Sequence, residues 1–239
     1  MKDLTFIIKT LLRPESLACL LRGLRRQYPD VPVLVADDAK DRGPARTVCN
    51  AFHAIHVPLG YDAGLSAGRN AMVDLVETDY LCTMDDDFVF TNATDIEKLL
   101  SLARSPIFQL ATGTVLQMGT EVHFEGRLWI QDRTMHLRSL RARRGKPIPV
   151  DIGWNFFVAE TAKVREVRWD DRLKICEHHD FFIRWRQAGY RCVYHPGVII
   201  DHRPETNPQY SELRHGRNHE YWALMQEKHG FQEVKGNLY

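Results

Sequence analysis

Short apolar runs alternate with segments of helical periodicity over the first hundred residues. Runs at 4–10, 31–38, 54–60 and 80–84 have the length and composition of strands. The leucines between residues 14 and 28 recur at helical spacing, and "GLSAGRNAMVDLVETD" indicates a loop that enters a helix. This alternation predicts an α/β fold with a mixed, mostly parallel central sheet and helices on both faces.

The second half continues the alternation less regularly. Residues 107–117, 150–160 and 190–202 are strand-like. The stretch 178–189 predicts a helix with Phe181, Phe182 and Trp185 inward and Gly189 as its C-terminal stop. A terminal helix over 207–230 is expected, with Gly216 as a point of interruption, and Thr94 and Glu97 form a capping box before an apolar helical face.

Composition and charge narrow the class of protein. The 239 residues carry 32 basic and 31 acidic side chains, so the net charge of +1 gives no support for a generic nucleic-acid binder. The apolar N-terminal stretch is too short and too interrupted for a membrane span or a signal peptide. Five scattered cysteines without a C-x-x-C pair predict reduced thiols in a cytosolic protein.

Polar side chains follow three of the predicted strands at the point where each strand ends. They are Lys9 and Thr10, then Asp37 and Asp38, then the run 85–87 of three aspartates. In open α/β sheets, ligands bind beyond the carboxyl ends of the strands. We therefore expect these three clusters to converge in space, although acids after a strand also commonly begin a turn.

The three aspartates of "YLCTMDDDFVFT" allow two interpretations. Two carboxylates about 4 Å apart repel by roughly 4 kcal/mol at an effective dielectric of about 20, so the run must either splay into water or be neutralised by a cation. On an extended chain, Asp85 and Asp87 would face one site and Asp86 would turn aside. Such oxygen ligands suit Mg²⁺ or Mn²⁺, whereas the alternative is an acidic turn.

Further candidates lie at single positions. Arg69 follows small residues at a predicted helix start and suits contact with a phosphate or a base. Asp180, in "CEHHDFF", is a candidate general base, or else part of a polar helix start. His202 follows an apolar run and is a ligand or a structural histidine. The arginine-rich segment 127–146 is a solvated loop or attracts an anionic acceptor or lipid headgroups.

The ordered segments "VADD", "AGRNAMV", "MDDDFVFT", "NFFVAETAKVREVRWDDRL", "HHDFF" and "VIIDH" together resemble a known family. They are similar to the catalytic domain of the β-1,4-N-acetylgalactosaminyltransferases of the GM2 and Sda type, which are nucleotide-sugar enzymes with a GT-A fold. The resemblance covers roughly residues 3–202. It implies one domain over 1–239, with a nucleotide-binding half at about 1–105, an acceptor half at about 106–202 and a tail at 203–239.

The resemblance also implies roles for individual residues. Asp87 is the main metal ligand, with Asp85 and His202 as further ligands, and Asp180 is the base that deprotonates the acceptor, with Glu177 as its alternative. The donor pocket is formed by Thr10, Arg13, Asp38, Arg69, Asp85 and Asp86, and the acceptor pocket by Trp154, Asn155 and His179. The implied cofactor is Mn²⁺ or Mg²⁺.

Together these expectations describe an inverting, metal-dependent transferase. It moves a sugar, GalNAc as first candidate, from a UDP-sugar donor to a hydroxyl of a glycan or glycolipid. The expected location is the cytoplasm, at the inner face of the membrane if the arginine-rich segment contacts lipid. Three alternatives stay open: a nucleotidyltransferase that makes sugar nucleotides, a non-catalytic protein that binds them, and a zinc hydrolase built on His178, His179, Asp180 and His202. The absence of a glycine-rich, lysine-bearing loop weighs against the first.

Overall fold

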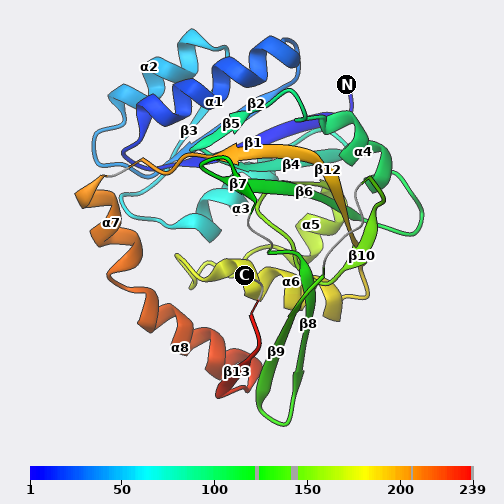
Figure 1. Ribbon diagram of the computed structural model, residues 1–239. Coiled ribbons are helices and arrows are strands. Elements are labelled where there is room, and N and C mark those ends of the chain that lie inside the picture. Colours follow the sequence, from blue (N-terminus) through cyan, green and yellow to red (C-terminus); the bar gives the residue numbers. More distant parts are fainter. Residues whose placement is uncertain (122–123, 141–144, 206, 238–239) are drawn as a thin grey trace.

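A large mixed sheet organises the computed structural model, which describes residues 1–121, 124–140, 145–205 and 207–237 (Figure 1). Its strands are ordered β10-β12-β6-β11-β4-β1-β2-β3, and β13-β9-β8 form a second, smaller sheet. The strands are β1 (Leu4–Thr10), β2 (Val33–Asp37), β3 (Ile55–Pro58), β4 (Tyr80–Asp85), β5 (Phe88–Phe90), β6 (Leu110–Gln117), β7 (Thr120–Glu121), β8 (Gly126–Gln131), β9 (Thr134–Ser139), β10 (Ile148–Val150), β11 (Phe157–Glu160), β12 (Cys192–His202) and β13 (Glu233–Lys235).

The N-terminal strands of the large sheet pair in parallel. Strands β4, β1, β2 and β3 lie parallel to one another, and β12 lies parallel to β6. Strand β11 runs antiparallel between β4 and β6, and β10 runs antiparallel to β12. The sheet is therefore mixed and mostly parallel, as the alternation of elements predicts.

Helices pack on both faces of this sheet. They are α1 (Pro14–Gln27), α2 (Gly43–Ala51), α3 (Leu65–Leu75), α4 (Ile96–Ala103), α5 (Thr161–Val167), α6 (Glu177–Gln187), α7 (Pro208–His215) and α8 (Asn218–His229). One core cluster joins the sheet to α1, α2 and α4, and a second joins it to α3, α5 and α6. No described helix is long and apolar enough to cross a membrane.

Local sequence explains where several helices begin and end. In α6, Phe181, Phe182 and Trp185 are buried, and Gly189 follows the helix with a φ of +85°. The predicted capping box is wrong in one detail: Asp95 is the N-cap of α4 and accepts from the Lys98 amide, while the Thr94 hydroxyl donates to the carbonyl of Ile199. Thr94 is drawn away because β12 passes beside the start of this helix.

The C-terminal segment forms two helices instead of one. The break falls at Gly216, as the sequence indicates, and α7 and α8 follow one side of the molecule from the sheet to the β8–β9 hairpin (Figure 1). Asn207 caps α7 and also donates to the carbonyl of Leu12, so the start of this segment lies beside the end of β1. The tail thus reaches the edge of the sheet where the polar strand ends meet.

Candidate active site

The polar strand ends converge, as predicted. Strand β1 lies between β2 and β4, and the register pairs Thr10 with Asp37 and Lys9 with Asp85. The Thr10 hydroxyl donates to Asp86 Oδ2 at 2.6 Å, and the Lys9 ammonium binds Asp38. Three clusters that are separate in the sequence therefore form one polar site at the carboxyl edge of the sheet.

The three aspartates are buried and paired, not splayed into water. The Arg13 guanidinium binds Asp86 through Nη2 and binds Asp87 Oδ2 through Nη1 at 2.5 Å. Asp86 is 0% and Asp87 is 4% exposed. The expectation that Asp86 turns aside is wrong, because β4 ends at Asp85 and the next two residues form a turn in which strand alternation no longer applies.

Burial and charge act in opposite directions on these carboxyl groups. Burial raises the pKa of Asp86 to about 6, although Arg13 favours its ionised form. Burial also disfavours the Asp87 carboxylate, but the hydrogen bond from His202 and the charge of Arg13 outweigh it and lower the pKa of Asp87. Asp87 is therefore the carboxylate that stays ionised most firmly.

Asp87 and His202 form a pair suited to a divalent cation. His202 Nε2 lies 3.0 Å from Asp87 Oδ2, while His202 Nδ1 lies 2.7 Å from Gln117 Oε1. Both ring nitrogens thus face oxygen acceptors, and a cation at this position would take the place of the Nε2 proton. An acceptor at Nδ1, here Gln117, is the usual support of a metal-binding histidine. Asp87 Oδ1 is buried without a hydrogen-bond partner, and a cation would satisfy it. Carboxylate and imidazole donors fit Mn²⁺.

The described residues contain no group of three or more His, Cys, Asp or Glu side chains arranged around one metal position. Asp85, the third predicted ligand, instead accepts from Arg69 Nη2 at 3.0 Å. Its side chain is 29% exposed, so it remains the accessible member of the run. A cleft of about 490 Å³, lined in part by Asp87, Ser16 and Arg203, opens beside the aspartates.

The Arg69 side chain bridges the end of β4 and the start of α6. Its guanidinium binds Asp85 through Nη2 and Glu177 through Nη1, and only 1% of the residue is exposed. It also lies over the ring of Trp169, at 5.6 Å from the ring centroid. Arg69 thus fixes the first residue of α6 next to the end of β4. The sequence indicates that Arg69 belongs to the site, but not that it bridges two carboxylates.

Asp38 is tied to the loop that precedes α3. Its Oδ2 accepts from the Gly64 amide at 2.8 Å and its Oδ1 binds Lys9, and the residue is fully buried. Gly64 has a φ of +98°, which lets its amide point at this carboxylate. A carboxylate held from two sides in this way is preorganised to accept a further donor.

The predicted acceptor residues surround the start of α6. Asn155 Oδ1 lies 2.7 Å from His178 Nδ1, and the rings of Trp154 and His179 both contact Phe124. The His178 Nε2 and Trp154 Nε1 atoms are buried without partners. Burial lowers the pKa of His178 well below its ordinary value of 6.5, so the ring is neutral and offers a lone pair.

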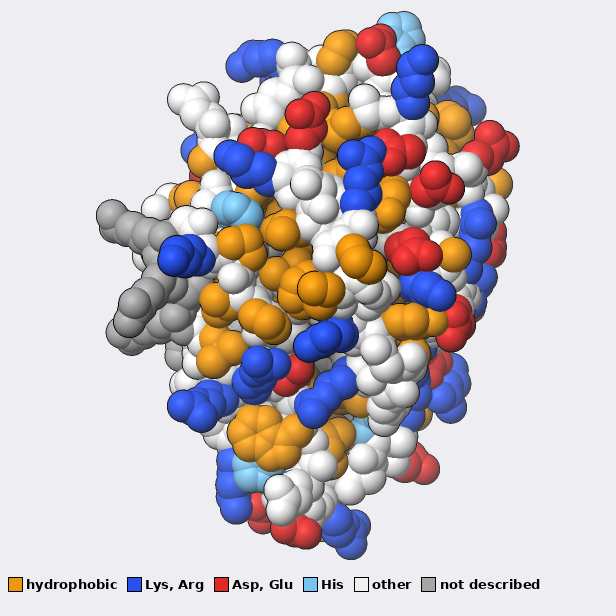
Figure 2. All heavy atoms as spheres, turned by 90° about the vertical axis from the view of Figure 1, so that its right-hand side faces the viewer, with side chains coloured by type: hydrophobic (Ala, Val, Ile, Leu, Met, Phe, Trp, Pro, Cys, Tyr) orange, Lys and Arg blue, Asp and Glu red, His pale blue; other side chains and the backbone are white. Residues whose placement is uncertain are grey.

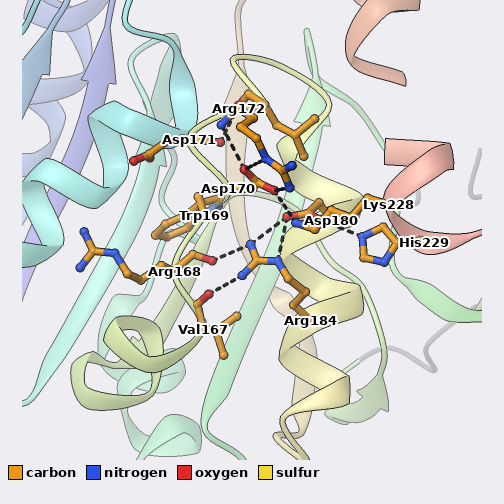
Figure 3. Close-up of polar contacts among 12 residues, drawn as sticks. Val167, Arg168, Trp169, Asp170, Asp171, Arg172, Asp180, Arg184, Lys228 and His229 are labelled. Carbon is orange, nitrogen blue, oxygen red and sulfur yellow. Dashed lines mark hydrogen bonds and ion pairs between the residues drawn. The ribbon is translucent and has the colours of Figure 1, made fainter. Parts of the chain in front are cut away.

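Asp180 points into a cluster of cations from α6 and α8 (Figure 3). Its Oδ2 accepts from Arg184 Nε at 2.9 Å, and its Oδ1 lies 2.8 Å from His229 Nε2 and 2.6 Å from Lys228 Nζ. Arg184 also donates to the carbonyls of Val167 and Arg168. The sequence does not reveal these partners, apart from the i,i+4 spacing of Asp180 and Arg184.

This setting does not suit a general base. Burial would raise the pKa of Asp180, but the hydrogen bonds from His229, Arg184 and Lys228 outweigh it and lower the pKa to about 2. Asp180 and Glu177 are both buried, at 0% and 3% exposed, so exposure does not separate them. Three cations, however, hold Asp180 between α6 and α8. These cations argue against the predicted role of Asp180. Glu177, in the same first turn of α6, instead binds Arg69, which also binds Asp85.

The profile of glycosyl transferase family 2 matches residues 5–166, which include all of β1 but Leu4, and also Asp38, Arg69 and the aspartate run. The chain belongs to glycosyltransferase family 2. The matched range contains the acidic strand ends described above.

Curated relatives carry a more specific name. The chain is 32% identical over 257 residues to mouse β-1,4 N-acetylgalactosaminyltransferase 2, a match that covers 98% of this chain and 47% of that protein. It is 35% identical over 209 residues to human β-1,4 N-acetylgalactosaminyltransferase 1, covering 83% of this chain and 38% of that protein. The chain thus spans about half the length, or less, of these relatives.

Solved structures confirm the GT-A glycosyltransferase fold. The crystal structure of S. aureus TarS 1–349 superposes with a TM-score of 0.63 at 14% identity, covering 84% of this chain and 60% of that one. The mannosyltransferase PcManGT from Pyrobaculum calidifontis, solved with GDP-Man and Mn²⁺, gives a TM-score of 0.62 at 10% identity, with 87% and 59% covered. At these identities the likeness concerns the fold alone.

Proposed function

We propose that the chain is an inverting, metal-dependent glycosyltransferase that uses a UDP-sugar, with UDP-GalNAc as the first donor to test. The acceptor is a hydroxyl group of a glycan or glycolipid. The observation that carries the proposal is the aspartate run, gathered at the carboxyl ends of the strands and held by Arg13, Arg69 and His202. The named relatives support GalNAc as the sugar.

The donor side follows from the charges that meet there. Asp87 and His202 would hold Mn²⁺ or Mg²⁺, with Asp85 at its edge, and the ion would supply Lewis-acid stabilisation of the departing diphosphate. Arg13 now neutralises Asp86 and Asp87 and is the nearest guanidinium for the diphosphate oxygens. Thr10 orients Asp86, and the preorganised Asp38 carboxylate accepts a uracil or ribose donor.

The acceptor side lies at the first turn of α6. We assign the acceptance of the hydroxyl proton to Glu177, whose Oε1 is fixed by Arg69 close to Asp85. His178, held through Nδ1 by Asn155, offers its Nε2 lone pair to a sugar hydroxyl. Trp154 and His179 form the aromatic wall of this pocket around Phe124.

Two paired substitutions separate Glu177 from Asp180. Glu177→Gln should lower kcat by about a hundredfold or more, the usual size of a general-base contribution, and leave donor binding intact. Asp180→Asn should retain kcat per folded molecule. If Glu177→Gln keeps wild-type turnover while Asp180→Asn loses it without unfolding, the assignment is reversed and Asp180 is the base.

A donor panel tests the proposed substrate class. The panel consists of UDP-GalNAc, UDP-GlcNAc, UDP-Gal and UDP-Glc, each added with Mn²⁺ or with a chelator. A bound donor should raise the melting temperature of the protein only when the ion is present. Pyrophosphate release from a sugar phosphate and a nucleoside triphosphate would instead support the nucleotidyltransferase alternative. Binding without any turnover, tested over a broad acceptor panel, would support the non-catalytic alternative.

The remaining expectations stay proposals. A cytoplasmic location and the division at about residues 105 and 202 follow from the sequence. Within the arginine-rich segment, residues 141–144 lie outside the described residues, so its proposed membrane contact has no structural description there.

A further inference from the structure

A cavity of about 450 Å³ lies at the start of β12, away from the site described above. Its wall includes Arg127, Asp151, Trp185, Arg186 and Arg191. Strand β12 runs from Cys192, in the cavity wall, to His202, and a strand advances roughly 3.3 Å per residue. The cavity and the aspartate run are therefore about 30 Å apart, at opposite ends of one strand.

Two of the arginines are oriented by one carboxylate. Asp151 accepts from Arg127 Nη1 at 3.3 Å and lies 3.6 Å from Arg186 Nη1. The Leu128 amide donates to Asp151 Oδ2 at 3.1 Å, the same oxygen that faces Arg186. Arg186 also donates to the Leu128 carbonyl. These contacts hold two guanidinium groups side by side at the cavity.

Arg191 adds a third positive charge to the same wall. Among the described residues its side chain forms no ion pair, and its guanidinium carbon lies 6.0 Å from the ring centroid of Phe108. The cavity wall thus carries three arginines against one aspartate. Figure 2, which views the molecule from the side of β10 and β8, shows basic side chains gathered over the lower half of this face.

A buried donor without an acceptor lies in the same wall. Trp185 is 0% exposed, and its indole Nε1 has no hydrogen-bond partner. A buried donor without an acceptor is unfavourable, and an anion in the cavity would be attracted to the positive end of this N–H dipole. The excess of positive charge and the unpaired donor both favour an anionic ligand.

We propose that this cavity binds a phosphate group, as the ester of a soluble metabolite or as a lipid headgroup. Guanidinium groups match phosphate oxygens in geometry as well as charge, and a pair already held by Asp151 loses little side-chain freedom on binding. The site lies outside the proposed catalytic centre, and none of the cavity residues named above belongs to the proposed donor or acceptor pocket. Its occupancy is independent of whether the chain transfers a sugar.

Calorimetric titration of the full chain with inorganic phosphate and with glycerol phosphate tests the site. Arg191→Gln should weaken binding about tenfold or more, since a hydrogen bond to a charged group contributes roughly 1.5–3 kcal/mol. Arg22→Gln removes the same charge from an exposed position on α1 and should bind as the wild type does. A double variant, Arg127→Gln with Arg191→Gln, should abolish binding while the circular dichroism spectrum is retained.

Flotation with lipid vesicles distinguishes the two sources. Binding to vesicles that contain phosphatidylglycerol, absent with phosphatidylcholine alone and lost in Arg191→Gln, supports the headgroup. Binding of glycerol phosphate without vesicle binding supports the soluble ester. The proposal is overturned if neither phosphate compound nor the anionic vesicles bind. Equal losses in Arg191→Gln and Arg22→Gln would overturn it too, because the effect would then be one of net charge.

Discussion

Asp180→Asn is the substitution whose outcome the structure specifies best. The carboxylate joins α6 to α8 through Lys228 and His229, and to its own helix through Arg184 (Figure 3). Its pKa of about 2 lies below the ordinary value of 3.8. That difference corresponds to about 2 kcal/mol of stability at neutral pH, at 1.36 kcal/mol for each pKa unit. Asparagine keeps the shape but loses this contribution.

The pH dependence gives a second, sharper expectation. A carboxyl group whose pKa is lowered on folding contributes its full stability above the unfolded pKa and loses it as pH falls toward the folded one. The difference in unfolding free energy between wild type and Asp180→Asn should therefore shrink as pH falls from about 4 toward about 2. Urea titrations across this range measure it.

Thermal melting offers a simpler readout at neutral pH. A loss of about 2 kcal/mol should lower Tm by roughly 4–8 °C for a chain of this size. Unchanged stability combined with lost turnover would refute the structural role of Asp180. It would mean that the carboxylate leaves its cation cluster during the reaction.

Two further predictions concern residues that support the site. Gly64→Ala should destabilise the fold by at least about 1 kcal/mol and weaken UDP binding, because φ at this position is +98° and a Cβ atom would lie 2.7 Å from the Lys174 Cα atom. Gly60→Ala is the matched control, since a Cβ atom there meets nothing within 4 Å; equal melting of both variants would contradict the reasoning. Gln117→Leu removes the acceptor of His202 Nδ1 and should weaken Mn²⁺ binding by about tenfold or more, measured by electron paramagnetic resonance. Unchanged Mn²⁺ affinity would contradict the supporting role of Gln117.

Periodicity and strand ends were sufficient to predict the sheet and the convergence of its polar ends. The parallel strands β1, β2 and β4 have apolar runs that are buried on both faces, and the pairing of Thr10 with Asp86 follows from their adjacency. The orientation of Asp86 could not be predicted, because a one-residue difference in where β4 ends reverses the side to which a side chain points.

The acceptor side was harder to predict because long-range ion pairs decide it. Asp180 and Glu177 both lie on the first turn of α6, and sequence alone treats them alike. Arg69, more than a hundred residues earlier, captures Glu177, while Lys228 and His229 from the last helix capture Asp180. Neither of these long-range pairings has a local signal in the sequence.

Metal-dependent sugar transfer at the aspartate run is tested most directly by comparing UDP-GalNAc turnover in the wild type and in Asp87→Asn. UDP release measures the rate, and NMR of the product identifies the glycosidic linkage. The account predicts UDP release that requires Mn²⁺ or Mg²⁺, a β-linked product from the α-linked donor, and loss of activity in the variant by at least about a hundredfold. Wild-type rates in Asp87→Asn, or equal rates in the presence of a chelator, would contradict a metal-dependent transfer at the aspartate run.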